Sequence, residues 1–164
     1  MQRIKYAAEE FLAGKRVAVT GVSREAKDHG SNVVYKRLRD RGYEVFAVNP
    51  SADEVEGDRC YHDLRSIPGG VDAVVIATRP ERAEETMREC ADLGIKHVWM
   101  HCMMGTKPGL AAGMTSVSQS AVEMCRANGI AVIPGSCPNQ FLKPDFGHGM
   151  MRGLWRLFGF MNVN

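Results

Sequence analysis

The first apolar run of the chain leads into a segment whose residue types suit phosphate binding. A glycine, a hydroxyl and a cation stand together in Thr20-Gly21-Val22-Ser23-Arg24, and Gly30-Ser31-Asn32 then opens a helical pattern. Glycine lets the main chain turn sharply, and the N–H groups at a helix start attract phosphate. Ser23 can donate a hydrogen bond, and Arg24 or Lys27 can neutralise an anion. The segment therefore indicates an anion site, with a plain strand-to-helix turn as the alternative.

The end of the second apolar run, together with the first loop, indicates which kind of nucleotide site the chain lacks. The fingerprint GxGxxG is absent, because Ser23 stands in place of its second glycine, and no GKS or GKT of a Walker loop occurs. An NAD-binding fold usually places an acid after its second strand, whereas this chain has Val48-Asn49-Pro50-Ser51. Pro50 can pack against an adenine, and Asn49 can bond to a ribose or a base. The alternative is that this pair is a turn signal alone.

The third strand end adds a small residue and a second cation, in Ala77-Thr78-Arg79-Pro80. Ala77 leaves room for a ligand to lie close, and the fork of Arg79 matches a phosphate. Pro80 suits the first turn of the helix that follows. The segment predicts a further part of the anion site, and the alternative is a surface arginine without a ligand.

Thiols and imidazoles at the later strand ends offer chemistry of another kind. His101 and Cys102 end the fourth strand, Cys137 follows the fifth, and His148 lies between two glycines. A cysteine beside a histidine can act as a nucleophile, and the same groups can bind a metal. Neighbouring strand ends bring many residues together by chance, and packed thiols are common. We therefore expect neither catalytic residues nor a metal site, with His148 reaching the ligand or capping the last helix.

A scaffold that gathers these strand ends at one edge is predicted by the hydrophobic pattern. Runs that are apolar on both faces alternate with helical patterns that stop at glycine, as in parallel sheets covered on both sides. We predict a doubly wound, Rossmann-like α/β fold with a five-stranded parallel sheet, whose carboxyl edge binds ligands. The expected strands are 16–21, 43–48, 72–77, 97–100 and 130–133, and the expected helices are 1–13, 33–41, 82–93 and 118–128.

Two further segments lie outside this alternation. Residues 103–115 hold three glycines and a proline with little periodicity, which predicts a long loop at the ligand edge. An extension over 136–164 ends in a helix at 149–160. Its apolar side suits core packing or a homodimer contact better than a membrane anchor. The residues of that side are Met150, Met151, Leu154, Trp155 and Phe158, and Arg152 and Arg156 form the other.

Length and composition limit the broad class. The 164 residues fit one domain, and a net charge of +2 is too small to indicate nucleic acid or an anionic membrane. No apolar run reaches the roughly 18 residues of a membrane span. The cysteines are odd in number and widely spaced, so we expect a reducing cytoplasm rather than a disulfide framework or a zinc ribbon. They are Cys60, Cys90, Cys102, Cys125 and Cys137.

Taken together, these segments resemble a known family, the small CoA-binding proteins, which are similar to the N-terminal nucleotide-binding domain of the succinyl-CoA synthetase α subunit. The resemblance covers residues 12–135, and the order of the motifs is more specific than any one of them. The motifs are Thr20-Gly21-Val22-Ser23, Val48-Asn49-Pro50, a stretch from Gly57-Asp58-Arg59-Cys60-Tyr61 to Ile67-Pro68, and Arg79-Pro80.

The resemblance implies coenzyme A or an acyl-CoA as the ligand of a non-catalytic accessory or sensor protein. It assigns three groups of residues by position. These are Gly21, Val22, Ser23 and Arg24 at the phosphates, Asn49 and Pro50 at the adenine or ribose, and Ala77, Thr78, Arg79 and Pro80 along the pyrophosphate and pantetheine. A lysine that often follows the Asn-Pro pair in the family is replaced by Ser51, so Arg24 or Lys27 would have to hold the 3′-phosphate.

The resemblance does not extend to ligase activity. The ligase relatives use a phosphorylated histidine in a separate domain, which we do not expect in 164 residues. Three alternatives remain open besides the accessory protein. They are an NAD(H)-binding redox regulator or reductase-like protein, an enzyme that uses Cys102 or Cys137 on a thioester, and an interaction subunit with a vestigial pocket.

Overall fold

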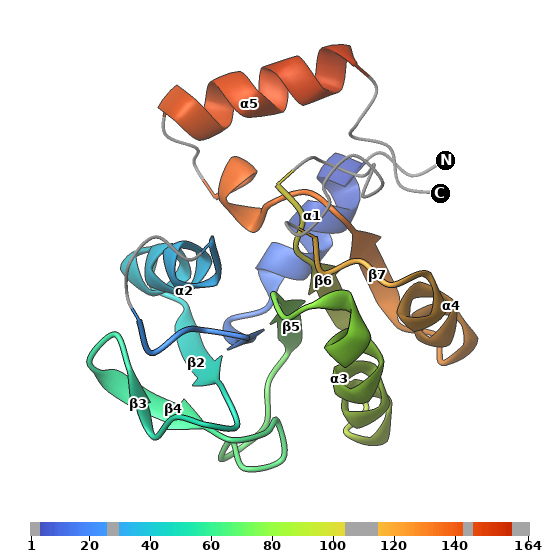
Figure 1. Cartoon of the computed structure of the whole chain (residues 1–164). Coiled ribbons are helices and arrows are strands. Elements are labelled where there is room, and N and C mark those ends of the chain that lie inside the picture. The colour runs from blue at the N-terminus through green and yellow to red at the C-terminus, as the bar shows by residue number, and fades with distance from the viewer. Residues whose placement is uncertain (1–3, 26–29, 104–114, 143–145, 159–164) are drawn as a thin grey trace.

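The computed structural model describes residues 4–25, 30–103, 115–142 and 146–158 (Figure 1). Within these ranges one seven-stranded sheet has the order β3-β4-β2-β1-β5-β6-β7. The strands are β1 (Arg16–Thr20), β2 (Glu44–Val48), β3 (Glu54–Val55), β4 (Asp58–Tyr61), β5 (Ala73–Ile76), β6 (His97–Met100) and β7 (Ala131–Pro134). The helices are α1 (Ile4–Ala13), α2 (Gly30–Asp40), α3 (Pro80–Asp92), α4 (Gln119–Ala127) and α5 (Phe146–Leu157), with a 3-10 helix, η2, at Pro138–Gln140.

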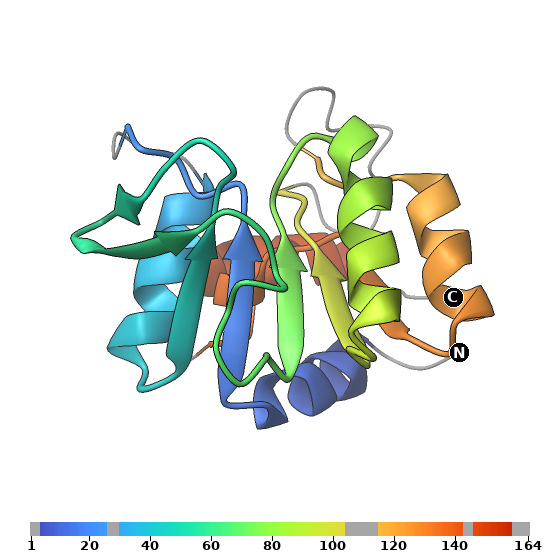
Figure 2. The ribbon, with the colours of Figure 1, turned by 90° about the horizontal axis from the view of Figure 1, so that it is seen from below.

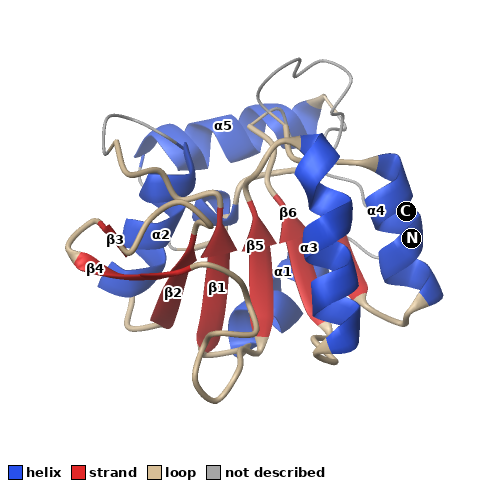
Figure 3. Ribbon diagram, turned by 60° about the horizontal axis from the view of Figure 1, so that its bottom comes forward, coloured by secondary structure: helices blue, strands red, loops and turns tan. Residues whose placement is uncertain are grey.

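The five predicted strands are confirmed, and all of them run parallel. β1 pairs with β2 on one side and with β5 on the other, and β6 and β7 continue the sheet beyond β5. The carboxyl ends of these strands therefore lie at one edge, called the carboxyl edge below (Figure 3). The doubly wound α/β fold predicted from the pattern of apolar runs is confirmed.

The predicted number of five strands is wrong by two. β3 and β4 form an antiparallel hairpin, and β4 also pairs parallel with β2. Glu56 and Gly57, with φ of 51° and 78°, make the tight turn between them. Such turns are usually marked by Asn-Gly or Asp-Gly, so a glutamate at the first position hid the hairpin. The two strands are also too short and too polar for a hydrophobic run to reveal them.

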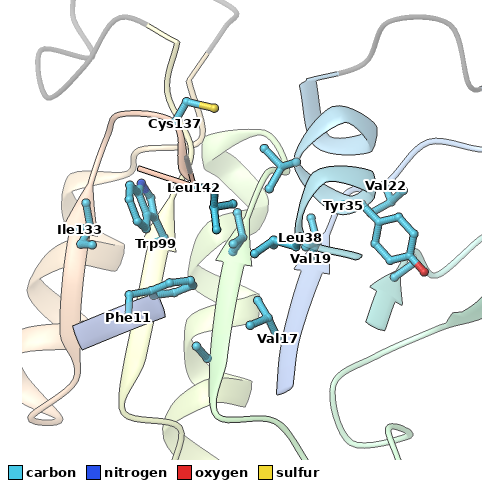
Figure 4. Packing of buried hydrophobic residues seen from close by; sticks show 14 of the residues in the cluster. Phe11, Val17, Val19, Val22, Tyr35, Leu38, Trp99, Ile133, Cys137 and Leu142 are labelled. Atoms are coloured by element: carbon cyan, nitrogen blue, oxygen red, sulfur yellow. The ribbon is translucent and has the colours of Figure 1, made fainter. Parts of the chain in front are cut away.

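Helices cover both faces of the sheet. α1 and α2 lie on one face, called the α1/α2 face, while α3 and α4 cover the other (Figure 2). On the α1/α2 face, Trp99 is fully buried and packs against Phe11 from α1 in a T-shaped arrangement, with 5.3 Å between ring centroids (Figure 4). On the other face, Met87 of α3 and Cys125 of α4 are buried in a separate hydrophobic core between these helices and the sheet. Both core clusters, one on each face of the sheet, contain side chains of β1 and β5, so packing on both faces fixes the position of these two strands relative to each other.

The segment after β7 folds back onto the α1/α2 face. Cys137 and Leu142 belong to the core there, and η2 between them is buried. α5 then lies against this segment, where Arg152 Nη1 donates to the carbonyl oxygen of Gln140 at 3.1 Å. The terminal helix predicted at 149–160 instead runs from Phe146 to Leu157, so both of its predicted ends are too late in the chain. Its predicted apolar side is largely exposed, as at Met150 and Phe158, which are 64% and 57% exposed.

Some predicted features lie outside the described residues. These are Lys27, nearly all of the loop at 103–115, the first three residues of helix 1–13, the last two residues of helix 149–160, and the side chain of His148. Among the helices that are described, none combines the length and the apolar character that a membrane span requires.

Candidate functional site

Gly21 brings the ends of three strands into contact at the carboxyl edge. Its N–H donates to the carbonyl oxygen of Val48, the last residue of β2, at 3.0 Å. Its φ is +76°, and a Cβ added to it would lie 2.8 Å from the carbonyl oxygen of Ala77 after β5. Glycine is required on both counts. Since α2 and α3 leave β1 and β5 toward opposite faces, this contact marks the switch point at which doubly wound sheets bind ligands (Figure 3).

Asn49 fastens the β2 end to the β1 loop. Its Nδ2 donates to the carbonyl oxygen of Val22 at 2.8 Å, and its Oδ1 accepts from the N–H of Ser51 at 2.9 Å. One N–H and one lone pair of the amide remain for a ligand. Pro50 follows at an exposed position. The structure thus places both residues beside the β1 loop, where Asn49 also has a structural role that the sequence did not reveal.

The loop after β1 is held in shape by Asn32, a residue of the first turn of α2. Oδ1 of Asn32 accepts from the N–H of Ser23 at 2.8 Å, and its Nδ2 donates to the carbonyl oxygen of Ser23 at 2.9 Å. Nδ2 also donates to Oε1 of Glu56 at 2.8 Å, which ties in the β3–β4 hairpin. Asn32 is 1% exposed. Sequence reasoning missed this role, and the available signal was an asparagine at a helical position that it does not favour.

The other members of the loop are divided between core and surface. Val22 is fully buried beside α2, so its side chain does not face a ligand as predicted, and only its main chain can (Figure 4). The Oγ of Ser23 accepts from the N–H of Glu25 at 3.1 Å, which leaves the hydroxyl hydrogen to donate. Arg24 is exposed. The loop therefore offers a hydroxyl and a cation beside the start of α2.

The β5 end adds a second cation and a second helix start. Arg79 is the N-cap of α3 and is exposed, and Pro80 occupies the first turn. Within the described ranges, the guanidinium groups of Arg79 and Arg24 have no hydrogen bond or ion pair. Two helix starts and two arginines at one edge create a positive potential that favours phosphate.

Unsatisfied hydroxyls mark the same edge. Thr20 at the end of β1 and Thr78 after β5 both have a buried Oγ1 with no hydrogen-bond partner. Buried polar groups are nearly always paired in folded proteins, so such atoms require an explanation. Their position at the switch point fits a site built for a polar ligand, and with the arginines it fits the phosphates of a nucleotide.

His101, Cys102 and Cys137 are brought near the carboxyl edge as expected. The N–H of Cys102 donates to the carbonyl oxygen of Ser136 at 2.9 Å, and Cys137 follows directly. His101 is 8% exposed and faces the start of α2, because a Cβ added to Gly30 would lie 3.4 Å from its Cε1. Burial lowers the pKa of His101 to about 4. In the described part of the chain, no three His, Cys, Asp or Glu side chains are grouped to hold a metal.

Fold and site together define a Rossmann-like nucleotide-binding domain. A family model described as a CoA binding domain matches residues 15–140. The chain therefore belongs to the CoA-binding domain family, and the resemblance noted from its motifs is confirmed.

Known proteins of two sizes are similar to this chain. The uncharacterized protein YneT of Bacillus subtilis is 31% identical over 129 residues, which are 79% of this chain and 86% of that protein. The ADP-forming acetate–CoA ligase II of Archaeoglobus fulgidus is 39% identical over 84 residues, which are 50% of this chain. The chain spans 12% of that ligase, so the match is to one part of a larger enzyme.

Solved structures share the fold. A hypothetical protein from Pyrococcus horikoshii superimposes with a TM-score of 0.71 at 24% identity, covering 96% of this chain and 94% of that one. The dinucleotide-forming acetyl-coenzyme A synthetase 1 of Candidatus Korarchaeum cryptofilum, in its apo form, gives a TM-score of 0.57 at 22% identity. That match covers 72% of this chain and 25% of the synthetase. These likenesses confirm the Rossmann-like α/β architecture.

Proposed function

We propose that this protein binds coenzyme A or an acyl-CoA at the carboxyl edge of β2, β1 and β5. The observation that carries the proposal is the contact of Gly21 with both Val48 and Ala77, which joins three separately predicted segments at the switch point. Membership of the CoA-binding domain family supports the same ligand.

The phosphates of the ligand bind at the β1 loop and the start of α2. The N–H groups in the first turn of α2, the hydroxyl of Ser23 and the exposed guanidinium groups of Arg24 and Arg79 supply donors and positive charge. Charged hydrogen bonds of this kind dominate phosphate affinity.

The adenosine lies over the β2 end, beside Asn49 and Pro50. The absence of an acid at this position in the sequence argues against the ribose contact that NAD-binding folds use. The exposed ring of Pro50 offers an apolar surface to the adenine, and Asn49 keeps one donor and one acceptor for it.

The protein acts as a non-catalytic accessory or sensor of CoA in the cytoplasm. Burial raises the pKa of the thiols of Cys60, Cys90 and Cys125, which makes these three cysteines poor nucleophiles and leaves only Cys102 and Cys137 for the alternative of an enzyme. The ligases that match the chain do so over a fraction of their length, so their reaction is not transferred to it. The exposed apolar side of α5 is the surface for a homodimer.

Ligand-dependent stability tests the function directly. Thermal unfolding is recorded with CoA, acetyl-CoA, adenosine 3′,5′-bisphosphate and NAD. We expect the two CoA compounds to stabilise the protein by about 2.7 kcal/mol at a concentration of about 100 times the dissociation constant, and NAD to have no effect. Stabilisation by NAD alone would replace this function by an NAD-dependent one. Release of CoA from acetyl-CoA by the protein would show that it is an enzyme.

A further inference from the structure

The start of α2 is approached from two sides of the sheet. On the β2 side of this helix start lies the β1 loop, in which the carbonyl oxygen of Val22 accepts a hydrogen bond from Asn49 Nδ2 at 2.8 Å. From the β6 side the helix start is reached by His101, whose Cε1 and Nε2 lie 3.4 and 3.9 Å from the position of a Cβ on Gly30. A ligand whose adenosine lies over β2 and whose phosphates lie at α2 therefore meets His101 next.

The imidazole of His101 lies at this position, and no hydrogen bond joins it to any other residue that the structure describes. His101 is 8% exposed. The ring faces the start of α2, where its nitrogens can donate a hydrogen bond to a ligand or accept one from it.

Beyond His101 the carboxyl edge continues to Cys137. The N–H of Gly135 donates to the carbonyl oxygen of Met100, and the N–H of Cys102 donates to that of Ser136, both at 2.9 Å. These bonds prolong the pairing of β6 with β7 up to Cys137. In Figure 4 Cys137 lies above the ring of Trp99, and its sulfur points sideways, in the direction of α2.

Buried amides lie next to Cys137. Asn139 is fully buried, and neither Oδ1 nor Nδ2 has a hydrogen-bond partner. The Nε2 of Gln140 also has none. The pantetheine arm of CoA carries two amides and ends in a thiol, so its chemistry complements these groups. From β1 to β7 the edge crosses three strand spacings, about 14 Å, which an extended arm can follow.

We propose that the pantetheine arm of the bound ligand leaves the phosphates past His101, which donates a hydrogen bond to it, and ends with its sulfur beside Cys137. This inference rests on the proposed function, because it assumes CoA at the switch point. It identifies a binding residue and a thiol-end subsite on β6 and β7 in addition to the three predicted strand ends.

Comparing the affinities for two ligands distinguishes contacts with the pantetheine arm from contacts with the nucleotide. CoA carries the arm, while adenosine 3′,5′-bisphosphate lacks it. We expect His101→Leu and His101→Asn to weaken CoA binding about tenfold and to change the affinity for the bisphosphate by less than about twofold. His97→Asn, at the opposite end of the same strand, is the control and should leave both affinities unchanged.

Disulfide exchange locates the end of the arm in the unmodified protein. In CoA disulfide, one CoA half binds the site and the Cys137 thiolate attacks the S–S bond. A Cys137–CoA mixed disulfide forms, and the second CoA leaves as a thiolate. We expect peptide mass spectrometry to find the adduct on Cys137 rather than on Cys60, Cys90, Cys102 or Cys125. Excess adenosine 3′,5′-bisphosphate should slow its formation, and oxidised glutathione should react more slowly.

The outcomes distinguish this inference from the proposed function. If CoA and the bisphosphate both bind, but His101 variants bind CoA normally or the adduct forms on another cysteine, the path of the arm is wrong and the CoA site stands. If neither ligand binds the wild-type protein, the proposed function fails and the inference fails with it. Should His101→Leu not fold, His101→Asn and the exchange on the wild-type protein decide the question.

Discussion

Asn32 and Ser23 are joined by two hydrogen bonds, in which the side-chain amide of Asn32 pairs with both the N–H and the carbonyl of Ser23. The amide thereby fixes the loop that follows β1 in the way that a neighbouring strand would. Because Asn32 is buried and also bonds to Glu56, the phosphate loop and the β3–β4 hairpin share one anchor.

Removing this anchor should therefore affect stability and binding together. In Asn32→Ala, the N–H and carbonyl of Ser23 lose their partners, and we expect a loss of about 1–3 kcal/mol in the free energy of unfolding. CoA affinity should also fall, although Asn32 need not touch the ligand. Asn128→Ala at the exposed end of α4 is the control. Urea unfolding and calorimetric titration measure both effects, and an Asn32 variant with wild-type CoA affinity would contradict the anchoring role.

Two glycines with the same backbone conformation allow the cost of backbone strain to be measured apart from the cost of a steric clash. Gly21 and Gly42 have φ of +76° and +80°, but a Cβ on Gly42 has nothing within 4 Å. Gly42→Ala should cost about 1–2 kcal/mol of stability, the price of a left-handed backbone. Gly21→Ala should cost about 1–3 kcal/mol more, because its Cβ meets the main chain at Ala77, and should abolish binding. Equal losses of stability in the two variants would show that the strand ends are not in close contact.

The two exposed arginines are expected to act through their charge. Arg24→Ala and Arg79→Ala should each weaken CoA binding by about 1–3 kcal/mol, as charged hydrogen bonds do, without lowering the melting temperature. The difference from wild type should shrink at high salt. Arg88→Ala, whose guanidinium pairs with Glu84 on α3, should bind normally. Unchanged affinity in both site variants would refute the assigned phosphate path.

His101 should make stability depend on pH. Its folded-state pKa, lowered by burial to about 4, lies below the ordinary value of 6.5. Between these values the unfolded chain binds a proton that the folded chain does not, so stability is full above pH 6.5 and falls as the pH drops toward 4. The slope from this group approaches ~1.4 kcal/mol per pH unit.

Urea unfolding at a series of pH values measures this slope. His101→Gln should flatten the curve over that range, because glutamine does not titrate. Asn128→Ala, which removes no titratable group, is the control and should leave the shape of the curve as it is in the wild type. A slope that survives in His101→Gln would place its origin elsewhere.

Much of the fold could be predicted because its elements are locally encoded. Each buried parallel strand, such as 97–100, is an apolar run, and each helix shows its own period and a glycine stop. The β3–β4 hairpin could not be predicted in this way. β4 is a strand because β2 lies beside it, with Ala47 opposite Cys60, and that pairing is a property of the assembled sheet.

The candidate site, like the fold, could be predicted only in part from the sequence. The pattern of apolar runs was enough to predict the fold class and the strand ends that approach one another, because parallel strands with right-handed crossovers must share a carboxyl edge. The direction of each side chain at that edge could be learned only from the folded chain. In the folded chain the side chain of Val22 lies in the core, and the amide of Asn32 bonds to Ser23. The ring of His101 faces the start of α2. These orientations depend on contacts between residues far apart in the chain, which periodicity and local residue preference do not contain.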